Sequence, residues 1–232
     1  MAQTKQLDLV SPSSIVVSGC DIPFSPSVRN LGLYLDQNLN MEVHVSQLCK
    51  SLYFQLRKLS KIRPFLSIDA AKKLATAFIL SRLDYCNALL VGLPQDKLAK
   101  LQRIQNHAAR IVLRRSRRDH ATPLLRSLHW LPVRARIDYK IAYLCFQCLH
   151  STSAPSYLCD LLEEYSPSRA LRSQDAFLLS VPRHCLASFG KKAFSVYAPT
   201  LWNSLPLSLR SISTLSTFKI QLKTHLFNSY LS

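Results

Sequence analysis

The chain has 232 residues, 48% of them hydrophobic, which is enough apolar sequence for one large domain or two small ones and excludes a chain that is disordered by composition. Only four glycines disfavour a turn-dense all-β fold. Thirty Lys and Arg against 13 Asp and Glu give a net charge of +17, which repels itself in a compact state. We therefore expect a polyanionic partner, of which nucleic acid fits best; a basic surface without a partner is the alternative.

Cysteine usage and the N-terminal sequence bear on the compartment. The seven cysteines are an odd number, and the first ten residues, MAQTKQLDLV, lack the apolar segment of a signal peptide. No uncharged run approaches the ~18 residues that a transmembrane helix needs. We expect free thiols and an intracellular protein, nuclear or cytoplasmic, that is neither secreted nor inserted in a membrane.

Strand-forming sequence is confined to the N-terminal region. Residues 14–18 (SIVVS) and 28–36 (VRNLGLYLD) are short apolar runs, and Pro23 and Pro26 predict turns between them. This pattern predicts a β-hairpin or two separate strand remnants. Because two strands alone are marginal in water, their sheet partners are expected upstream.

Helical periodicity begins near Asn40. Apolar residues recur at steps of three and four from Leu48 to Leu66, and Pro64 predicts the end of this helix or a kink in it. Ser67 is placed to cap a second helix, which runs to about Asp84. Further helices are expected at 131–149, 191–203 and 215–230, with shorter ones beginning near Thr122-Pro123 and Pro155. The last long helix carries one apolar face: Phe218, Leu222 and Leu226.

A third long helix, with Pro94 at its first position, has both an apolar and a basic face. The apolar face comprises Leu98, Leu101, Ile104, Ala108, Ile111 and Val112. The basic face and the sequence that follows it comprise Lys100, Arg103, His107, Arg110, Arg114, Arg115, Arg117 and Arg118. From Lys97 to Lys140 there are 12 Lys and Arg but only two acids, Asp119 and Asp138. We predict a surface that binds the phosphate backbone of nucleic acid, with a merely solvated charged face as the alternative.

Six strings are spread over residues 28–227: VRNLGLYLD (28–36), SRLDYCNALLVGL (81–93), LQRIQNHAAR (101–110), HWLPVRAR (129–136), APTLWNSLP (198–206) and FKIQLKTHLF (218–227). Together they resemble the region after the palm in the reverse transcriptases (RNA-directed DNA polymerases) of non-LTR, LINE-type retrotransposons. The resemblance implies a mainly α fold with three parts. Residues 1–38 would be a β remnant of the palm end, 39–118 a thumb-like helical bundle and 119–232 a helical C-terminal extension.

The same resemblance implies site residues and partners. Leu31 and Gly32 would lie at the primer grip, and the basic helix would contact RNA or an RNA–DNA duplex. The family's catalysis needs an adjacent Asp pair and a third carboxylate that together hold two divalent ions. The adjacent acids here are Glu163 and Glu164, far from that position. The chain is therefore expected to be non-catalytic, with no cofactor and no small-molecule substrate. The alternatives are a functionless relic reading frame of a truncated retroelement, and a host-adopted protein-interaction module.

Other residue patterns in the sequence give weaker evidence for a functional site. The Cys145-x-x-Cys148-x-His150 spacing suggests half of a zinc site, but both cysteines fall in an apolar helical segment, so core packing is expected and no metal site is assigned. Cys86 lacks the flanking signature of a hydrolase nucleophile. Trp130 and Trp202 are expected to anchor the core rather than to stack on bases. Arg82 and Asp84 are expected to pair locally.

Overall fold

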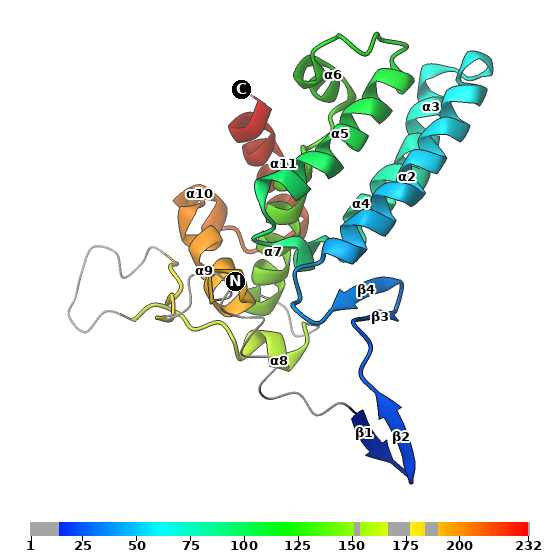
Figure 1. Cartoon of the computed structure of the whole chain (residues 1–232). Helices are drawn as coiled ribbons and strands as arrows, with labels where there is room; N and C mark the ends of the chain where they lie inside the picture. Colours follow the sequence, from blue (N-terminus) through cyan, green and yellow to red (C-terminus); the bar gives the residue numbers. More distant parts are fainter. Residues whose placement is uncertain (1–13, 151–153, 167–176, 184–189, 232) are drawn as a thin grey trace. The chain divides into compact units, whose positions relative to one another are not determined.

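The computed structural model describes residues 14–150, 154–166, 177–183 and 190–231 (Figure 1). Of these described residues, 64% are helical and 9% lie in strands, which confirms the expectation of a mainly α chain. The chain divides into two compact units, Met1–Ser51 and Leu52–Ser232. The boundary falls inside helix α2 (Glu42–Ile62), which begins in the first unit and continues into the second.

The first unit contains two antiparallel hairpins. Strand β1 (Ser14–Val17) pairs with β2 (Cys20–Pro23), and β3 (Ser27–Asn30) pairs with β4 (Leu33–Asp36). Each pair forms a separate two-stranded sheet. Each hairpin closes through a two-residue turn in which both residues have positive φ, as the right-handed twist of hairpins favours.

The two strand runs do not pair with each other, so of the two expected arrangements the single hairpin is wrong. Ser14–Val17 pairs instead with the neighbouring Cys20–Pro23, which was expected to belong to the turn region. Residues 28–36 fold back on themselves, so Leu31 and Gly32 form the turn between β3 and β4 rather than lying in a strand. Leu31 has a φ of 47° and Gly32 one of 85°. The leucine signalled strand by its apolar character, while the adjacent glycine supplies the freedom that the turn requires.

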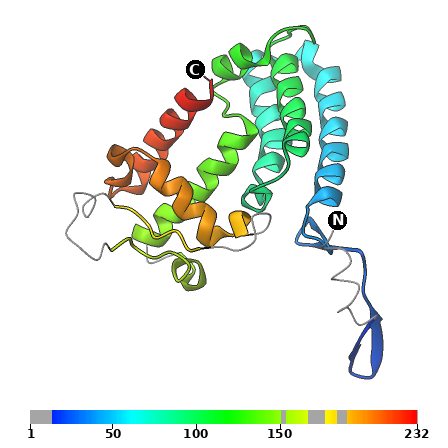
Figure 2. The ribbon, with the colours of Figure 1, turned by 60° about the vertical axis from the view of Figure 1, so that its left-hand side comes forward.

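The second unit holds the remaining helices (Figures 1 and 2). The longer ones, in chain order, are the second half of α2, α3 (Ile68–Ala75), α5 (Gln95–Val112), α6 (Ala121–Leu128), α7 (Val133–His150), α9 (Phe194–Ser204) and α11 (Leu215–Leu231). The shorter ones are the 3-10 turn η1 (Arg63–Phe65), the π-helical turn η2 (Thr76–Leu80), α4 (Ser81–Asp84), η3 (Asn87–Leu90), α8 (Ser156–Cys159), η4 (Gly190–Lys192) and α10 (Leu207–Arg210).

Most of the predicted helix limits are confirmed. Pro64 lies in η1, directly after α2 ends at Ile62. The Ser67 hydroxyl accepts a hydrogen bond from the Ala70 amide at 3.2 Å and caps α3, from which the chain stays helical to Asp84. Pro94 caps α5 instead of occupying its first turn, a shift of one residue. Residues 165–190 were expected from the sequence to be irregular, and of their basic residues Arg169, Arg172 and His184 lie outside the described residues.

Helix α7 is the centre of the second unit. It contacts α5 as well as α9 and α11. Its Phe146 ring stacks on Phe218 of α11, with ring centroids 4.3 Å apart, and Trp202 of α9 lies 5.8 Å from Phe218. Trp202 and Phe218 are almost fully buried, and so are Leu222 and Leu226. The predicted apolar face of the last helix and the predicted role of Trp202 are therefore confirmed.

The same core contains a buried carboxylate. Asp138 of α7, only 3% exposed, accepts hydrogen bonds from the hydroxyls of Tyr197 on α9 and Tyr230 on α11, both at 2.6 Å. Arg134, one turn earlier, donates to the Tyr197 hydroxyl at 2.8 Å and lies 3.6 Å from the Asp138 carboxylate. The carboxylate thus joins three helices that come from distant parts of the sequence.

The cysteines fit packing roles. Cys145 is fully buried in α7, where burial raises the pKa of its thiol, and the His150 ring makes a tilted contact with Phe146, with centroids 4.4 Å apart. The six cysteines within the described residues are free, and Cys185 lies outside them. No group of three or more metal-ligating side chains occurs among the residues that the structure describes. None of the described helices is long and apolar enough to span a membrane.

The bond from Tyr197 to Asp138 predicts a stability effect. Tyr197→Phe removes a donor to a buried charge, so the free energy of unfolding should fall by about 1.5–3 kcal/mol in urea titrations. Tyr157→Phe is the matched control, because Tyr157 is 68% exposed, and it should change stability by less than about 0.5 kcal/mol. Equal losses in the two variants would contradict the importance of the carboxylate.

The same cluster predicts a response to alkali. Burial, followed by the hydrogen bond to Asp138, raises the pKa of Tyr230 to about 12. Its protonated form therefore contributes stability fully below the unfolded pKa of about 10, and this stability is lost as the pH rises through about 12. Tyr230→Phe should show a shallower loss of unfolding free energy over this pH interval than the unchanged protein. Parallel curves would rule out the linkage.

Candidate nucleic-acid interface

The C-terminal end of α5 is closed by a buried arginine. Arg63, 5% exposed, donates from Nη2 to the Val112 carbonyl at 2.7 Å and from Nε to the Ile111 and Val112 carbonyls at 3.1 and 3.0 Å. Its Nη1 donates to the carbonyl of Leu66 at 2.7 Å. Burial, and then repulsion from Arg114, lowers the pKa of Arg63, but a guanidinium stays charged in proteins. The cation thus meets the negative end of the α5 dipole.

Two of the predicted phosphate-binding arginines hold backbone in the same way. The Arg114 guanidinium donates to the carbonyls of Arg63 and Pro64 at 3.2 and 2.9 Å. Arg110 donates through Nε and Nη2 to the Asp119 carbonyl at 3.1 and 2.8 Å. Arg114 also has a φ of 51° and lies beyond the last residue of α5, so it does not continue the helical basic face.

The remaining residues of the predicted basic face on α5 differ in their exposure to solvent. Lys100 and Arg103 are exposed and three residues apart, hence on one side of α5. His107 is half-buried, and burial, followed by repulsion from Arg117 and Arg110, lowers its pKa. His107 is therefore mostly neutral at pH 7 and adds little to the positive charge.

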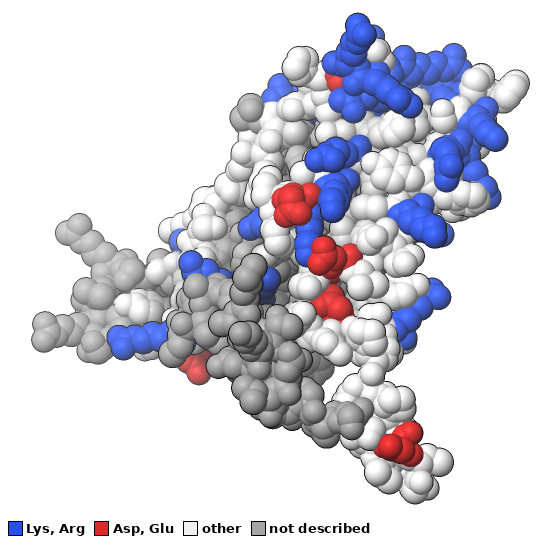
Figure 3. Space-filling view, viewed as in Figure 1, with Lys and Arg blue, Asp and Glu red and all other residues white. Residues whose placement is uncertain are grey.

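The exposed cations gather where α2 and α5 end. Arg115, Arg117 and Arg118 are exposed in the loop between α5 and α6. Because Arg63 and Arg114 bind the end of α2 to the end of α5, the exposed basic side chains on the last turns of α2 lie at this same end. We call the following residues the basic end: Arg57, Lys58, Lys61, Arg115, Arg117 and Arg118 (Figure 3).

Few negative charges oppose the basic end. Asp119, in the same loop, accepts a hydrogen bond from the Ser116 amide at 3.2 Å and so is used to shape the loop. Asp69 lies in the first turn of α3, where it favours the helix dipole. The loop after α5 was predicted from the sequence as part of the site, but the α2 residues were not, because the long-range bonds of Arg63 and Arg114 are what bring the two helix ends together.

The other expected site residues are placed as follows. Leu31, 82% exposed, and Gly32 form the β3–β4 turn in the first unit. Asp84, expected to pair with its neighbour Arg82, pairs with Arg136, whose Nη1 donates to it at 2.7 Å. Comparisons with protein-family models, curated proteins and solved structures find no match to this chain.

The bonds of Arg63 predict that a positive charge without the guanidinium geometry cannot maintain stability at position 63. Arg63→Lys keeps the charge but cannot reproduce the planar set of donors, so unfolding free energy should fall by about 3 kcal/mol or more in urea titrations. Arg57→Lys, at an exposed site one and a half turns earlier on α2, is the control and should leave stability within about 0.5 kcal/mol. An unchanged Arg63→Lys protein would show that the capping bonds contribute nothing.

Proposed function

We propose that this chain is a non-catalytic piece of a LINE-type RNA-directed DNA polymerase that binds the backbone of RNA or an RNA–DNA duplex. The observation that carries the proposal is the basic end, where exposed Lys and Arg from helix α2 and from the loop after α5 gather at the joined ends of the two helices. Side chains of this kind bind phosphate without reading sequence.

The resemblance of the six strings supports the assignment of parts. In this proposal, the hairpins of residues 14–36 are the end of a palm, the helices from α2 to α5 are thumb-like, and the helices from α6 onward form the C-terminal extension. The protein would act inside the cell, beside nucleic acid. A thumb needs no chemistry of its own, since its task is to hold a duplex.

The basic end meets the requirements of a backbone-binding surface. Three arginines follow one another closely in the loop, and three further cations lie on neighbouring turns of α2. The loop is held in shape from inside, by Arg110 on the Asp119 carbonyl and by the Asp119 carboxylate on the Ser116 amide. The exposed arginines are thus presented from a fixed backbone, which lowers the entropic cost of binding.

A salt series tests the proposal. Fluorescence anisotropy with an RNA–DNA hybrid should show log K falling linearly with log salt concentration. The variant Arg115→Gln/Arg117→Gln/Arg118→Gln should reduce that slope by about 2–3, since each lost duplex phosphate contact removes about 0.9. This variant leaves Arg63, Arg110 and Arg114 in place, so the fold keeps its internal bonds.

The control is matched in charge. Arg29→Gln/Arg183→Gln/Lys191→Gln removes the same charge from exposed positions outside the basic end and should leave the slope nearly unchanged. Equal slopes in the two variants would mean that the net charge, and not this surface, attracts the nucleic acid. A folded protein that does not bind at low salt would refute the proposal in favour of a relic reading frame or a protein-interaction module.

A further inference from the structure

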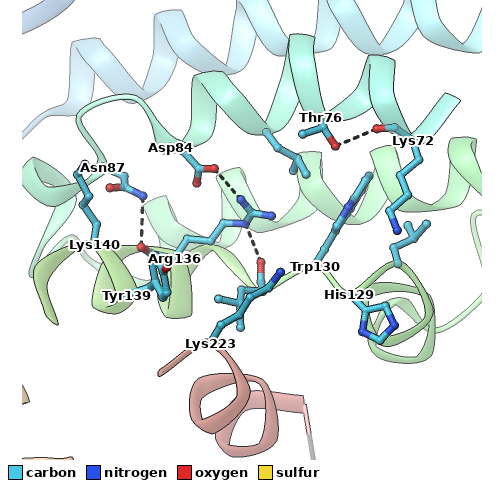
Figure 4. A pocket seen from close by; sticks show the side chains of 13 residues that line it. Lys72, Thr76, Asp84, Asn87, His129, Trp130, Arg136, Tyr139, Lys140 and Lys223 are labelled. Carbon is cyan, nitrogen blue, oxygen red and sulfur yellow. Dashed lines mark hydrogen bonds and ion pairs between the residues drawn. The ribbon is translucent and has the colours of Figure 1, made fainter. Parts of the chain in front are cut away.

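A cavity of about 540 Å³ opens in the second unit, among α3, the segment from η2 to η3, the end of α6, α7 and α11 (Figure 4). Its size lies in the range of small-molecule sites and far exceeds what a single inorganic anion fills. Its lining shares no residue with the basic end. What this cavity binds is therefore a separate question from backbone binding.

The lining of the cavity is positively charged. Lys72 reaches it from α3, Lys140 from α7 and Lys223 from α11. Asp84, the acid among the described lining residues, is already paired with Arg136, which also donates to the Leu131 carbonyl at 2.8 Å. The three lysines are thus left without a carboxylate in the cavity, and bringing them together favours an anion between them.

A neutral donor faces the same space. Trp130 is only 4% exposed, yet its indole N–H has no hydrogen-bond partner among the described residues. Among the described residues, two fully buried side-chain atoms lack a hydrogen-bond partner, the Asp36 Oδ2 and the Asn87 Oδ1. The Trp130 indole N–H also lacks a partner but is not one of these fully buried atoms. It is therefore accessible from the cavity that Trp130 lines. Buried indole N–H groups usually have an acceptor, and a ligand oxygen would supply one.

The arrangement of these groups is directional. Figure 4 shows Lys72 descending from α3 and Lys223 rising from α11, both toward the Trp130 side chain. Tyr139 and Lys140 line the other end of the cavity, beyond the Arg136–Asp84 pair. One end therefore offers two ammonium groups and an N–H to an anion, and the other offers a half-buried aromatic ring and a third cation.

We propose that this cavity binds a nucleotide, with its phosphate between Lys72 and Lys223 and its base directed toward Tyr139. Two cations and an N–H suit phosphate oxygens, and the volume and aromatic wall suit a nucleoside. The same chemistry is offered by a free nucleoside monophosphate and by a terminal nucleotide of a strand that carries a 5′-phosphate. The inference does not rest on the proposed function, because it concerns different residues.

Calorimetric titration of the full chain tests this, with AMP, UMP, adenosine and inorganic phosphate as separate probes. AMP or UMP should bind with saturation, and adenosine and phosphate at least about tenfold more weakly, since each lacks one half of the contacts. Lys72→Gln/Lys223→Gln should weaken nucleotide binding by about tenfold or more, as the loss of charge-assisted bonds predicts. Trp130→Phe should weaken it by a smaller factor.

The matched control is Lys73→Gln/Lys219→Gln, which removes the same charge from the same two helices outside the cavity lining and should change affinity by less than about twofold.

A 5′-phosphorylated trinucleotide that competes with AMP would identify a strand end as a source, and a trinucleotide that fails to compete would identify the free nucleotide. Arg115→Gln/Arg117→Gln/Arg118→Gln should keep nucleotide binding even if it loses the duplex. Phosphate or adenosine binding as tightly as AMP, equal weakening in the control, or no saturation by either nucleotide would overturn the proposal.

Discussion

The buried guanidinium of Arg63 is the constraint on which the arrangement of the basic end depends. It ties the end of α2 to the last carbonyls of α5, 48 and 49 residues further along the chain. A buried cation is tolerated only when its donors are satisfied, and here carbonyl oxygens and the helix dipole do this instead of a carboxylate. Arg114 returns the contact by donating to the carbonyls of Arg63 and Pro64. The ends of α2 and α5 are therefore bound to each other, and this contact positions the loop that contains the exposed arginines.

The opposite charge organises the centre of the second unit. Asp138 draws the hydroxyls of Tyr197 and Tyr230 to α7, beside the stacked rings of Phe146 and Phe218. The apolar faces of Leu-rich helices can slide by a turn at little cost, whereas a buried carboxylate with two tyrosine donors is satisfied in one alignment only. The ring contacts and the carboxylate fix the same packing of α7, α9 and α11.

Local signals predicted much of this fold. Pro64, the Ser67 cap and the Phe218–Leu222–Leu226 face follow from rules that act within one or two turns, and the structure confirms them. The Leu31-Gly32 turn was missed, because an apolar residue at its first position masks a signal that Asn or Asp would have given. The roles of Arg63, Arg110 and Arg114 could not be predicted, because an arginine bound to carbonyls has the same sequence signature as one on a solvated face. Long-range contacts alone separate the two.

Whether each charged side chain is bonded inside the fold or exposed decides where the positive charge lies on the surface. Between Lys97 and Lys140 the acids are Asp119 and Asp138, and both are occupied inside the fold, one by a loop amide and the other by two tyrosines. Asp84 is likewise paired with Arg136 at the edge of the cavity. Asp138 is buried and Asp84 is paired with an arginine, which leaves Asp119 as the carboxylate within the loop of the basic end and leaves the cavity lysines without an unpaired acid in the described lining. The basic end and the cavity lining therefore each keep an excess of cations, which is the feature that both proposals require.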